Sequence, residues 1–179
     1  MKRILPLLLI LSPSAALAHS GHDFGSYAGV LHPFTGADHL LAMLGVGLWA
    51  SLQTKARLAL PLTSLTAMAA GFGLAASGVT LPATEPLILA SVILLGAAVA
   101  LSLRAPLALT LPLVALFGLA HGSAHGTAGS GPAFALGMLG ATAVLHGAGA
   151  ALGMVLNRIT LRLAGAVTLI AGLGLAITG

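Results

Sequence analysis

The sequence contains little charge and no cysteine. Charged side chains make up 6% of its 179 residues, against about a quarter in a typical soluble domain. Seven Lys and Arg and three Asp and Glu residues cannot cover a water-facing surface. The lack of cysteine excludes a disulfide framework and thiolate metal sites. The basic residues form no continuous run or face, so nucleic acid is not an expected partner.

Apolar and small residues are abundant instead. Hydrophobic residues make up 58% of the chain, and 24 residues are glycine. Such a composition excludes disorder, and small residues let helices approach closely in lipid. The apolar runs do not alternate with polar residues, as the strands of a membrane barrel would. We therefore expect an all-α, polytopic membrane protein whose surroundings are the lipid bilayer.

Residues 1–18 have the pattern of a cleavable signal peptide. Lys2 and Arg3 precede a short apolar run, and Ala16-Leu17-Ala18 is a small-x-small cleavage pattern. The run is shorter than the roughly 20 residues that cross a bilayer, although an uncleaved anchor is an alternative. Cleavage would leave a transmembrane permease domain at 19–179. A cleaved signal on a multi-pass protein indicates a bacterial inner membrane, with the mature N-terminus outside the cytoplasm.

Six apolar stretches follow, each long enough or nearly so for a tilted transmembrane helix. They lie near residues 30–52, 58–77, 86–103, 107–126, 133–156 and 163–178. The first, third and fifth connections contain the remaining basic residues: Lys55, Arg57, Arg104, Arg158 and Arg162. The positive-inside rule places these connections in the cytoplasm and both mature termini in the periplasm. Trp49, near the end of the first stretch, is expected to anchor the membrane interface.

Ionisable side chains within these stretches are the main functional signal, because they are rare and costly in a membrane. The candidate metal-binding residues are His32, Asp38, His39, His121, His125, His146 and Glu85. Imidazole nitrogen and carboxylate oxygen suit divalent transition metals such as nickel, cobalt, zinc or copper.

The string His32-Pro33-Phe34-Thr35-Gly36-Ala37-Asp38-His39 is the strongest local pattern. Pro33 suits the first turn of a helix, with His32 near the N-cap. Seven residues apart, His32 and His39 would face the same way on an ideal helix. Asp38 would orient a ligand histidine, or Gly36 would loosen the helix and bring Asp38 round. A capping histidine with a structural Asp–His pair is the alternative.

The string His121-Gly122-Ser123-Ala124-His125-Gly126 ends the fourth stretch. Histidines four residues apart share a helix face and can bind one ion, although two interfacial histidines without a ligand role would have the same spacing. His146 is either a further ligand or pathway residue, or a histidine bonded to a backbone carbonyl. Glu85 is either an acidic entry or proton-coupled group, or a simple helix cap.

These strings, the signal peptide and the six-stretch length together resemble the HupE/UreJ family over essentially the whole mature chain. Members are bacterial nickel permeases associated with hydrogenase or urease. The resemblance implies that His32, Asp38 and His39 are needed for transport, with His121 and His125 in the second motif and a role for Glu85. The family's second motif often continues His-Gly-x-Glu, whereas Thr127 and Ala128 follow Gly126 here.

Two function classes follow. The first is a secondary transporter of a divalent cation, nickel or alternatively cobalt, with the ion as substrate and no permanently bound cofactor. The second is an intramembrane metal-dependent enzyme or metal-sensing module. The sequence contains no Gly-x-x-x-x-Gly-Lys-Ser/Thr string, so nothing indicates ATP hydrolysis by this chain or an ATPase subunit. The transporter class is favoured, and the chain is not expected to be an enzyme.

Overall fold

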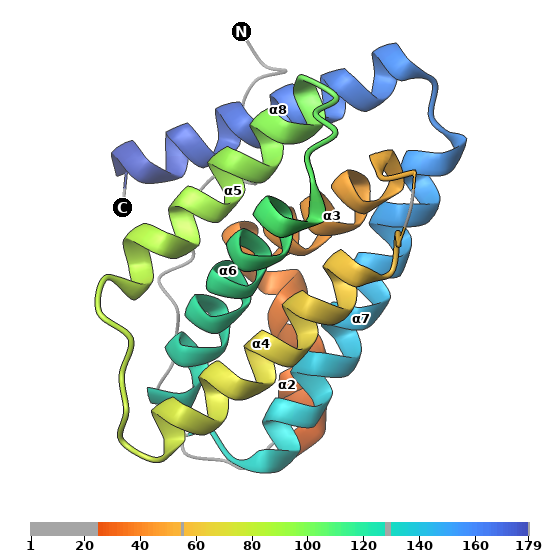
Figure 1. Cartoon of the computed structure of the whole chain (residues 1–179). Coiled ribbons are helices and arrows are strands. Elements are labelled where there is room, and N and C mark those ends of the chain that lie inside the picture. The colour runs from red at the N-terminus through yellow and green to blue at the C-terminus, as the bar shows by residue number, and fades with distance from the viewer. Residues whose placement is uncertain (1–24, 55, 128–129, 179) are drawn as a thin grey trace, which may run out of the picture.

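The computed structural model describes residues 25–54, 56–127 and 130–178. Every regular element in these ranges is an α-helix (Figure 1). The helices are α2 (Gly25–Thr35), α3 (Ala37–Leu52), α4 (Ala59–Ala76), α5 (Thr84–Ala100), α6 (Leu107–Thr127), α7 (Pro132–Val155) and α8 (Arg158–Thr178). The expected signal peptide at 1–18 lies outside the described residues.

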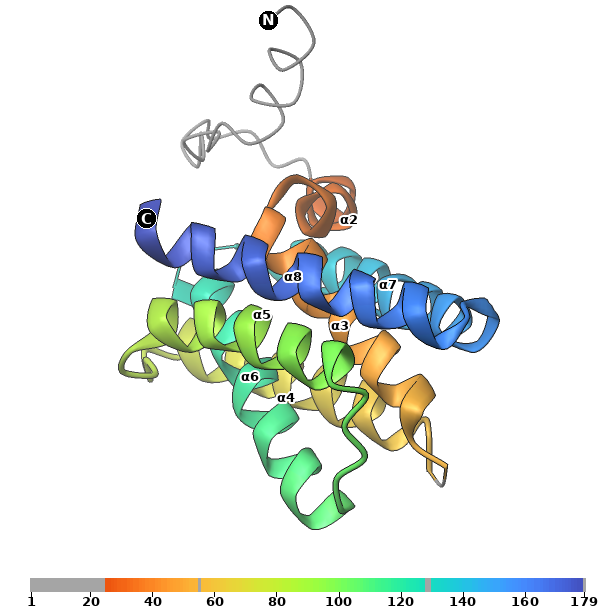
Figure 2. The ribbon, with the colours of Figure 1, turned by 90° about the horizontal axis from the view of Figure 1, so that it is seen from above.

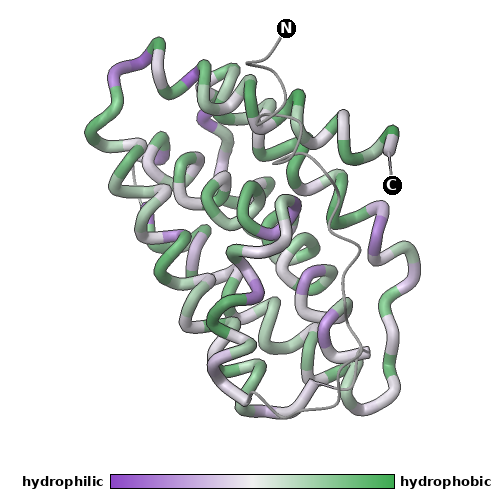
Figure 3. The backbone as a smooth tube through the Cα atoms, turned by 180° about the vertical axis from the view of Figure 1, so that it is seen from behind, coloured by the Kyte–Doolittle hydropathy of each residue, from purple (hydrophilic) through white to green (hydrophobic). Residues whose placement is uncertain are grey.

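Four of these helices, α4, α6, α7 and α8, are long and apolar enough to cross a membrane. Helices α3 and α5 are apolar but shorter, at 16 and 17 residues. Large apolar side chains are exposed on the outside of the bundle, among them Leu136, Val155 and Ile177. Such a surface suits lipid rather than water, and the tube in Figure 3 is coloured as hydrophobic over most of its length. The chain is a multi-pass membrane protein.

The first expected stretch, 30–52, is two helices rather than one. The break is at Gly36, whose extended backbone (φ −94°, ψ 120°) separates α2 from α3. Helix α2 begins at Gly25, and Pro33 lies in its last turn instead of the first turn of a helix. The continuous helix expected through the motif at 32–39 is therefore wrong.

The last connection is also shorter than expected, because α8 begins at Arg158 and not near residue 163. The side-chain oxygen of Asn157 accepts hydrogen bonds from the backbone N–H groups of Ile159 and Thr160, at 3.0 Å each. This side-chain cap satisfies N–H groups that the first helical turn leaves free. It places Arg158 and Arg162 on the helix instead of in a loop.

Glycines allow the main helix pairs to pack closely. A Cβ atom at Gly71 of α4 would collide with the backbone of Leu119 on α6, and one at Gly47 of α3 with the backbone of His146 on α7. The α5–α8 pair meets in the same way at Gly96. Figures 1 and 2 both show α5 beside α8. Contacts of this kind hold helices together in lipid, where the hydrophobic effect does not.

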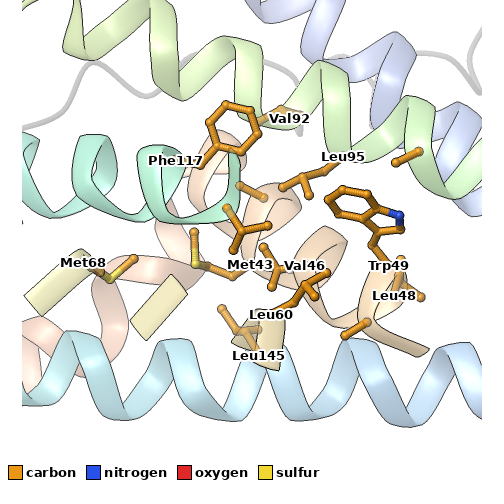
Figure 4. Packing of buried hydrophobic residues seen from close by; sticks show 14 of the residues in the cluster. Met43, Val46, Leu48, Trp49, Leu60, Met68, Val92, Leu95, Phe117 and Leu145 are labelled. Atoms are coloured by element: carbon orange, nitrogen blue, oxygen red, sulfur yellow. The ribbon is translucent and has the colours of Figure 1, made fainter. Parts of the chain in front are cut away.

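The apolar core lies around α3, which passes through the middle of the bundle. Figure 4 shows Met43, Val46 and Trp49 of α3 packed among side chains of the surrounding helices. Trp49 is 4% exposed, and its indole N–H donates a 3.0 Å hydrogen bond to the carbonyl of Leu103. The expectation that Trp49 anchors the membrane interface is wrong, because the ring is buried and fastens α3 to the α5–α6 connection.

Candidate metal site

The break at Gly36 positions the first histidine motif. Helix α2 ends with a 2.9 Å hydrogen bond from the Thr35 hydroxyl to the carbonyl of His32, and α3 begins directly after Gly36. His32 thus lies in the last turn of α2 and His39 in the first turn of α3, with ring centres 5.8 Å apart. The two rings are close because the chain bends between two helices. They do not lie on the same face of one continuous helix.

The second histidine motif packs directly against the first. The ring centres of His32 and His125 are 4.4 Å apart, and those of His39 and His121 are 4.5 Å apart. The Nδ1 atoms of His39 and His121 lie 3.2 Å apart, at hydrogen-bond distance. Two strings separated by more than eighty residues therefore form one cluster, at the end of α2, the start of α3 and the end of α6.

Three of the four rings are arranged as a candidate ion site. One ligand atom from each of His32, His39 and His125 lies within 4.8 Å of the other two. The Nε2 atoms of His39 and His125 are buried and have no hydrogen-bond partner among the described residues. Nitrogen ligands about 2 Å from one ion are at most about 4 Å apart. These atoms would therefore have to approach slightly to share one ion, and further ligands would fill its remaining coordination positions.

His121 is not in this group of three, and its bonds instead fix the tautomer of His39. The Ser91 hydroxyl donates its one hydrogen to the Ile88 carbonyl at 2.6 Å. It must therefore accept from Nε2–H of His121, 3.0 Å away. Nδ1 of a neutral His121 is then an acceptor, so Nδ1–H of His39 donates to it. Nε2 of His39 is left as a bare lone pair, the form in which imidazole binds a metal.

His146 lies beside Met43, one helical turn along α3 from His39, and is 1% exposed. Its Nδ1 is 2.9 Å from the carbonyl of Met43, which can only accept, so Nδ1 carries the hydrogen. The bond to a backbone carbonyl is one of the two alternatives that the sequence left open for this residue. It does not exclude the other, because Nε2 of His146 is left as a buried lone pair with no partner among the described residues.

Neither predicted acid belongs to the three-histidine group. Asp38 is half-buried in the first turn of α3. Its carboxylate is close enough to His32 for the two side chains to interact electrostatically. Glu85 is in the first turn of α5, and its side chain is exposed. Position 128, where this chain lacks the acid common in the family motif, lies outside the described residues, beyond the end of α6 at Thr127.

Ser91 is the residue of this cluster that the sequence did not indicate. It is fully buried in α5 and lies 30 positions before its partner His121. No spacing rule connects a serine to a histidine on another helix. The available signal was its place as a hydroxyl inside the apolar stretch 86–103, where a polar group needs a partner.

Comparisons with known proteins agree with these motifs. The family model described as "HupE / UreJ protein" matches residues 7–177. Protein HupE of Rhizobium leguminosarum bv. viciae is 36% identical over 181 residues, which cover 96% of this chain and 95% of the relative. No solved structure matches the chain significantly. The family is linked to nickel uptake. With nearly its whole length matched, the chain belongs to the HupE/UreJ family.

Proposed function

We propose that this protein is a secondary transporter that carries a divalent transition-metal cation, nickel in the first place, into the cytoplasm across the bacterial inner membrane. The observation that carries the proposal is the group of His32, His39 and His125, with two buried Nε2 atoms that have no protein partner among the described residues. A buried, unpaired polar atom is costly, and a cation would satisfy these lone pairs. Family membership supports nickel as the substrate.

The burial of the histidines supports a direction of passage. His32 and His125 are partly exposed, His39 is 3% exposed, and His146 is 1% exposed. An ion would bind first between the outer rings, transfer to Nε2 of His39, and then meet the unpaired Nε2 of His146. Neutral imidazoles compensate little of the ion's charge, so binding is weak enough for release. Asp38 would supply one negative charge beside His32.

The proposed membrane arrangement has six spans, with α2 and α3 together forming the first. The connections that contain Arg57 and Arg104, together with the start of α8, would be cytoplasmic, and the histidine cluster would open to the periplasm. A divalent cation entering the cell then moves down the membrane potential. The potential supplies about 2.3 kcal/mol per charge per 100 mV, twice that for this ion. No ATP-hydrolysing partner is needed for such transport.

Uptake of radiolabelled nickel by cells that express the protein tests the proposal. We expect His39→Ala and Asp38→Ala each to reduce uptake to background without removing the protein from the membrane. Thr168→Val is the matched control, because its hydroxyl bonds Ala164 within α8, away from the histidines. If His39→Ala and Asp38→Ala transport normally, this cluster is structural and the ion passes elsewhere.

Parallel uptake of labelled cobalt decides between the two cargo ions. Competition by unlabelled nickel shows which of the two ions the protein prefers. A resident-metal enzyme or sensor is distinguished by exchange. Purified transporter loaded with nickel should release the ion within seconds to minutes of dilution, whereas a resident metal would stay bound.

A further inference from the structure

A cavity of about 770 Å³ lies at the end of the molecule opposite the histidine cluster. It opens where α3, α5 and α7 end and α8 begins. Three arginines line it, Arg57, Arg104 and Arg158, each from a different connection or helix start. This end includes the α7–α8 turn, coloured as hydrophilic at the upper left of Figure 3.

No acidic side chain among the described residues lies beside the arginines of this cavity. The full sequence has three acidic residues, Asp23, Asp38 and Glu85. Asp38 and Glu85 lie in the first turns of α3 and α5, whereas the cavity lies at the last turns of the same helices. A separation of thirteen helical residues is roughly 20 Å, well beyond the screening length of about 8 Å in physiological salt. Neither Asp38 nor Glu85 can therefore pair with these arginines, which leaves them open to an external anion.

One of the three arginines is held by contacts with the protein, and all three side chains are exposed. The Arg57 guanidinium donates from Nε to the carbonyl of Gln53 at 3.1 Å and contacts the Met154 sulfur at 3.6 Å. For Arg104 only the preceding backbone is tied, because the Leu103 carbonyl accepts the hydrogen bond from the Trp49 indole. Fixing the Arg57 guanidinium beforehand reduces the entropy that binding an anion would cost.

A second observation points to a ligand with hydrogen-bonding oxygens. Ser102 also lines the cavity, and its hydroxyl is buried with no hydrogen-bond partner among the described residues. Its backbone is left-handed (φ 52°), a conformation that residues other than glycine rarely adopt. A hydroxyl donor among three guanidinium groups matches the oxygens of a phosphate ester.

The surroundings of the cavity favour a lipid over a soluble phosphate. Leu103, Val155 and Ile159 are next to or near the arginines in sequence, and their side chains are 46%, 78% and 73% exposed. Apolar side chains beside a cationic cavity at the ends of membrane helices can contact acyl chains while the arginines contact the headgroup. We propose that this arginine cavity binds the phosphate of an anionic phospholipid, at a site that shares no residue with the histidine cluster.

The test uses the purified full-length protein in a neutral detergent, with native mass spectrometry and thermal midpoint as readouts. Phosphatidylglycerol is the probe, and phosphatidylcholine, inorganic phosphate and polyglutamate are the comparison arms. We expect phosphatidylglycerol to bind and raise the midpoint, and the other three to do neither at the same concentration. Equal binding of phosphatidylcholine, or stronger binding of inorganic phosphate or polyglutamate, would overturn the assignment to an anionic lipid.

Substitutions locate the site. Arg104→Gln and Arg158→Gln should each weaken phosphatidylglycerol binding about fivefold, the effect of one basic residue near an anionic headgroup. Arg104→Lys should retain most of the binding and covers the case in which Arg104→Gln folds poorly. The matched control is Arg162→Gln, because Arg162 lies at the same end but donates to the Ala100 carbonyl and does not line the cavity. If Arg162→Gln weakens binding as much as Arg104→Gln, diffuse surface charge binds the lipid, and the cavity does not.

Discussion

At the scale of single residues, the hydroxyl of Ser91 determines which nitrogen of His39 is free. Its hydrogen goes to the Ile88 carbonyl, so the chain from Ser91 through His121 to His39 has one neutral arrangement. We expect Ser91→Ala to weaken nickel binding roughly tenfold or more, the usual cost of losing a group that orients a metal-binding histidine. Calorimetric titration of the purified protein measures the change.

Ser64→Ala is the control for this prediction. Ser64 is also buried, at 1% exposure, but its hydroxyl has no hydrogen bond to a histidine among the described residues. Its loss should leave the nickel affinity unchanged. Equal affinities of Ser91→Ala and the unaltered protein would mean that His121 does not control the tautomer of His39.

Replacement of His146 should affect transport more than metal binding. Its free Nε2 is deeper than the three-histidine group and outside it. We expect His146→Leu to bind nickel within about threefold of the unaltered protein, and to transport it at less than a tenth of the rate, because the inner ligand is missing. Titration and uptake on the same variant measure the two quantities. Loss of both together would place His146 in the first binding site.

At the scale of helices, Gly71 and Gly73 of α4 form a natural matched pair. A Cβ atom at Gly71 would collide with the backbone of Leu119 on α6, whereas one at Gly73 has nothing within 4 Å. Gly71→Ala should destabilise the protein by about 1–3 kcal/mol, the usual cost of overpacking. Gly73→Ala should be neutral or slightly stabilising, because alanine favours helix. The thermal midpoint in detergent measures both, and an equal midpoint for the two variants would contradict the close α4–α6 contact.

The same scale shows what the sequence could predict of the fold. Composition and apolar length identified the helices α4, α5, α6 and α7 closely, because lipid requires long apolar segments with internal hydrogen bonds. The bend at Gly36 was missed, because Pro33 and Gly36 suit either a helix start or a helix end. Hydropathy alone also could not place Trp49, since a tryptophan at a helix end can face the interface or fasten a neighbouring connection.

The candidate site was predictable in its histidines but not in its arrangement. Ionisable residues in apolar stretches identified His32, His39, His121, His125 and His146. Which histidine faces the candidate ion site and which bonds to another group depends on distances between helices. No spacing in the sequence encodes those distances. The bond from His121 to Ser91, the 2.9 Å bond from His146 to Met43 and the separation of Glu85 from the cluster are of this kind. The roles of the proposed ligands stay predictions.

At the scale of the whole molecule, the acidic and basic side chains of the described residues lie at opposite ends. Asp38 and Glu85 are at the same end as the histidine cluster, whereas Arg57, Arg104 and Arg158 line the cavity at the other end. In the proposed orientation, a cation would enter beside negative charge and leave past positive charge. The arginines would raise the energy of a cation near the exit in either direction of passage, so the inward drive would come from the membrane potential.

Reporter fusions test this orientation in cells. A reporter fused after Gly179 should be active in the periplasm, and one inserted at Arg104 should be active in the cytoplasm. The physical reason is that loops rich in Lys and Arg stay on the cytoplasmic side. All five basic residues after position 18 belong to the first, third and fifth expected connections. Alkaline phosphatase is active in the periplasm, and green fluorescent protein is fluorescent in the cytoplasm. Both reporters are therefore placed at each position. A cytoplasmic C-terminus with a cleaved signal would mean an odd number of spans, and would put α2 and α3 in doubt as one span.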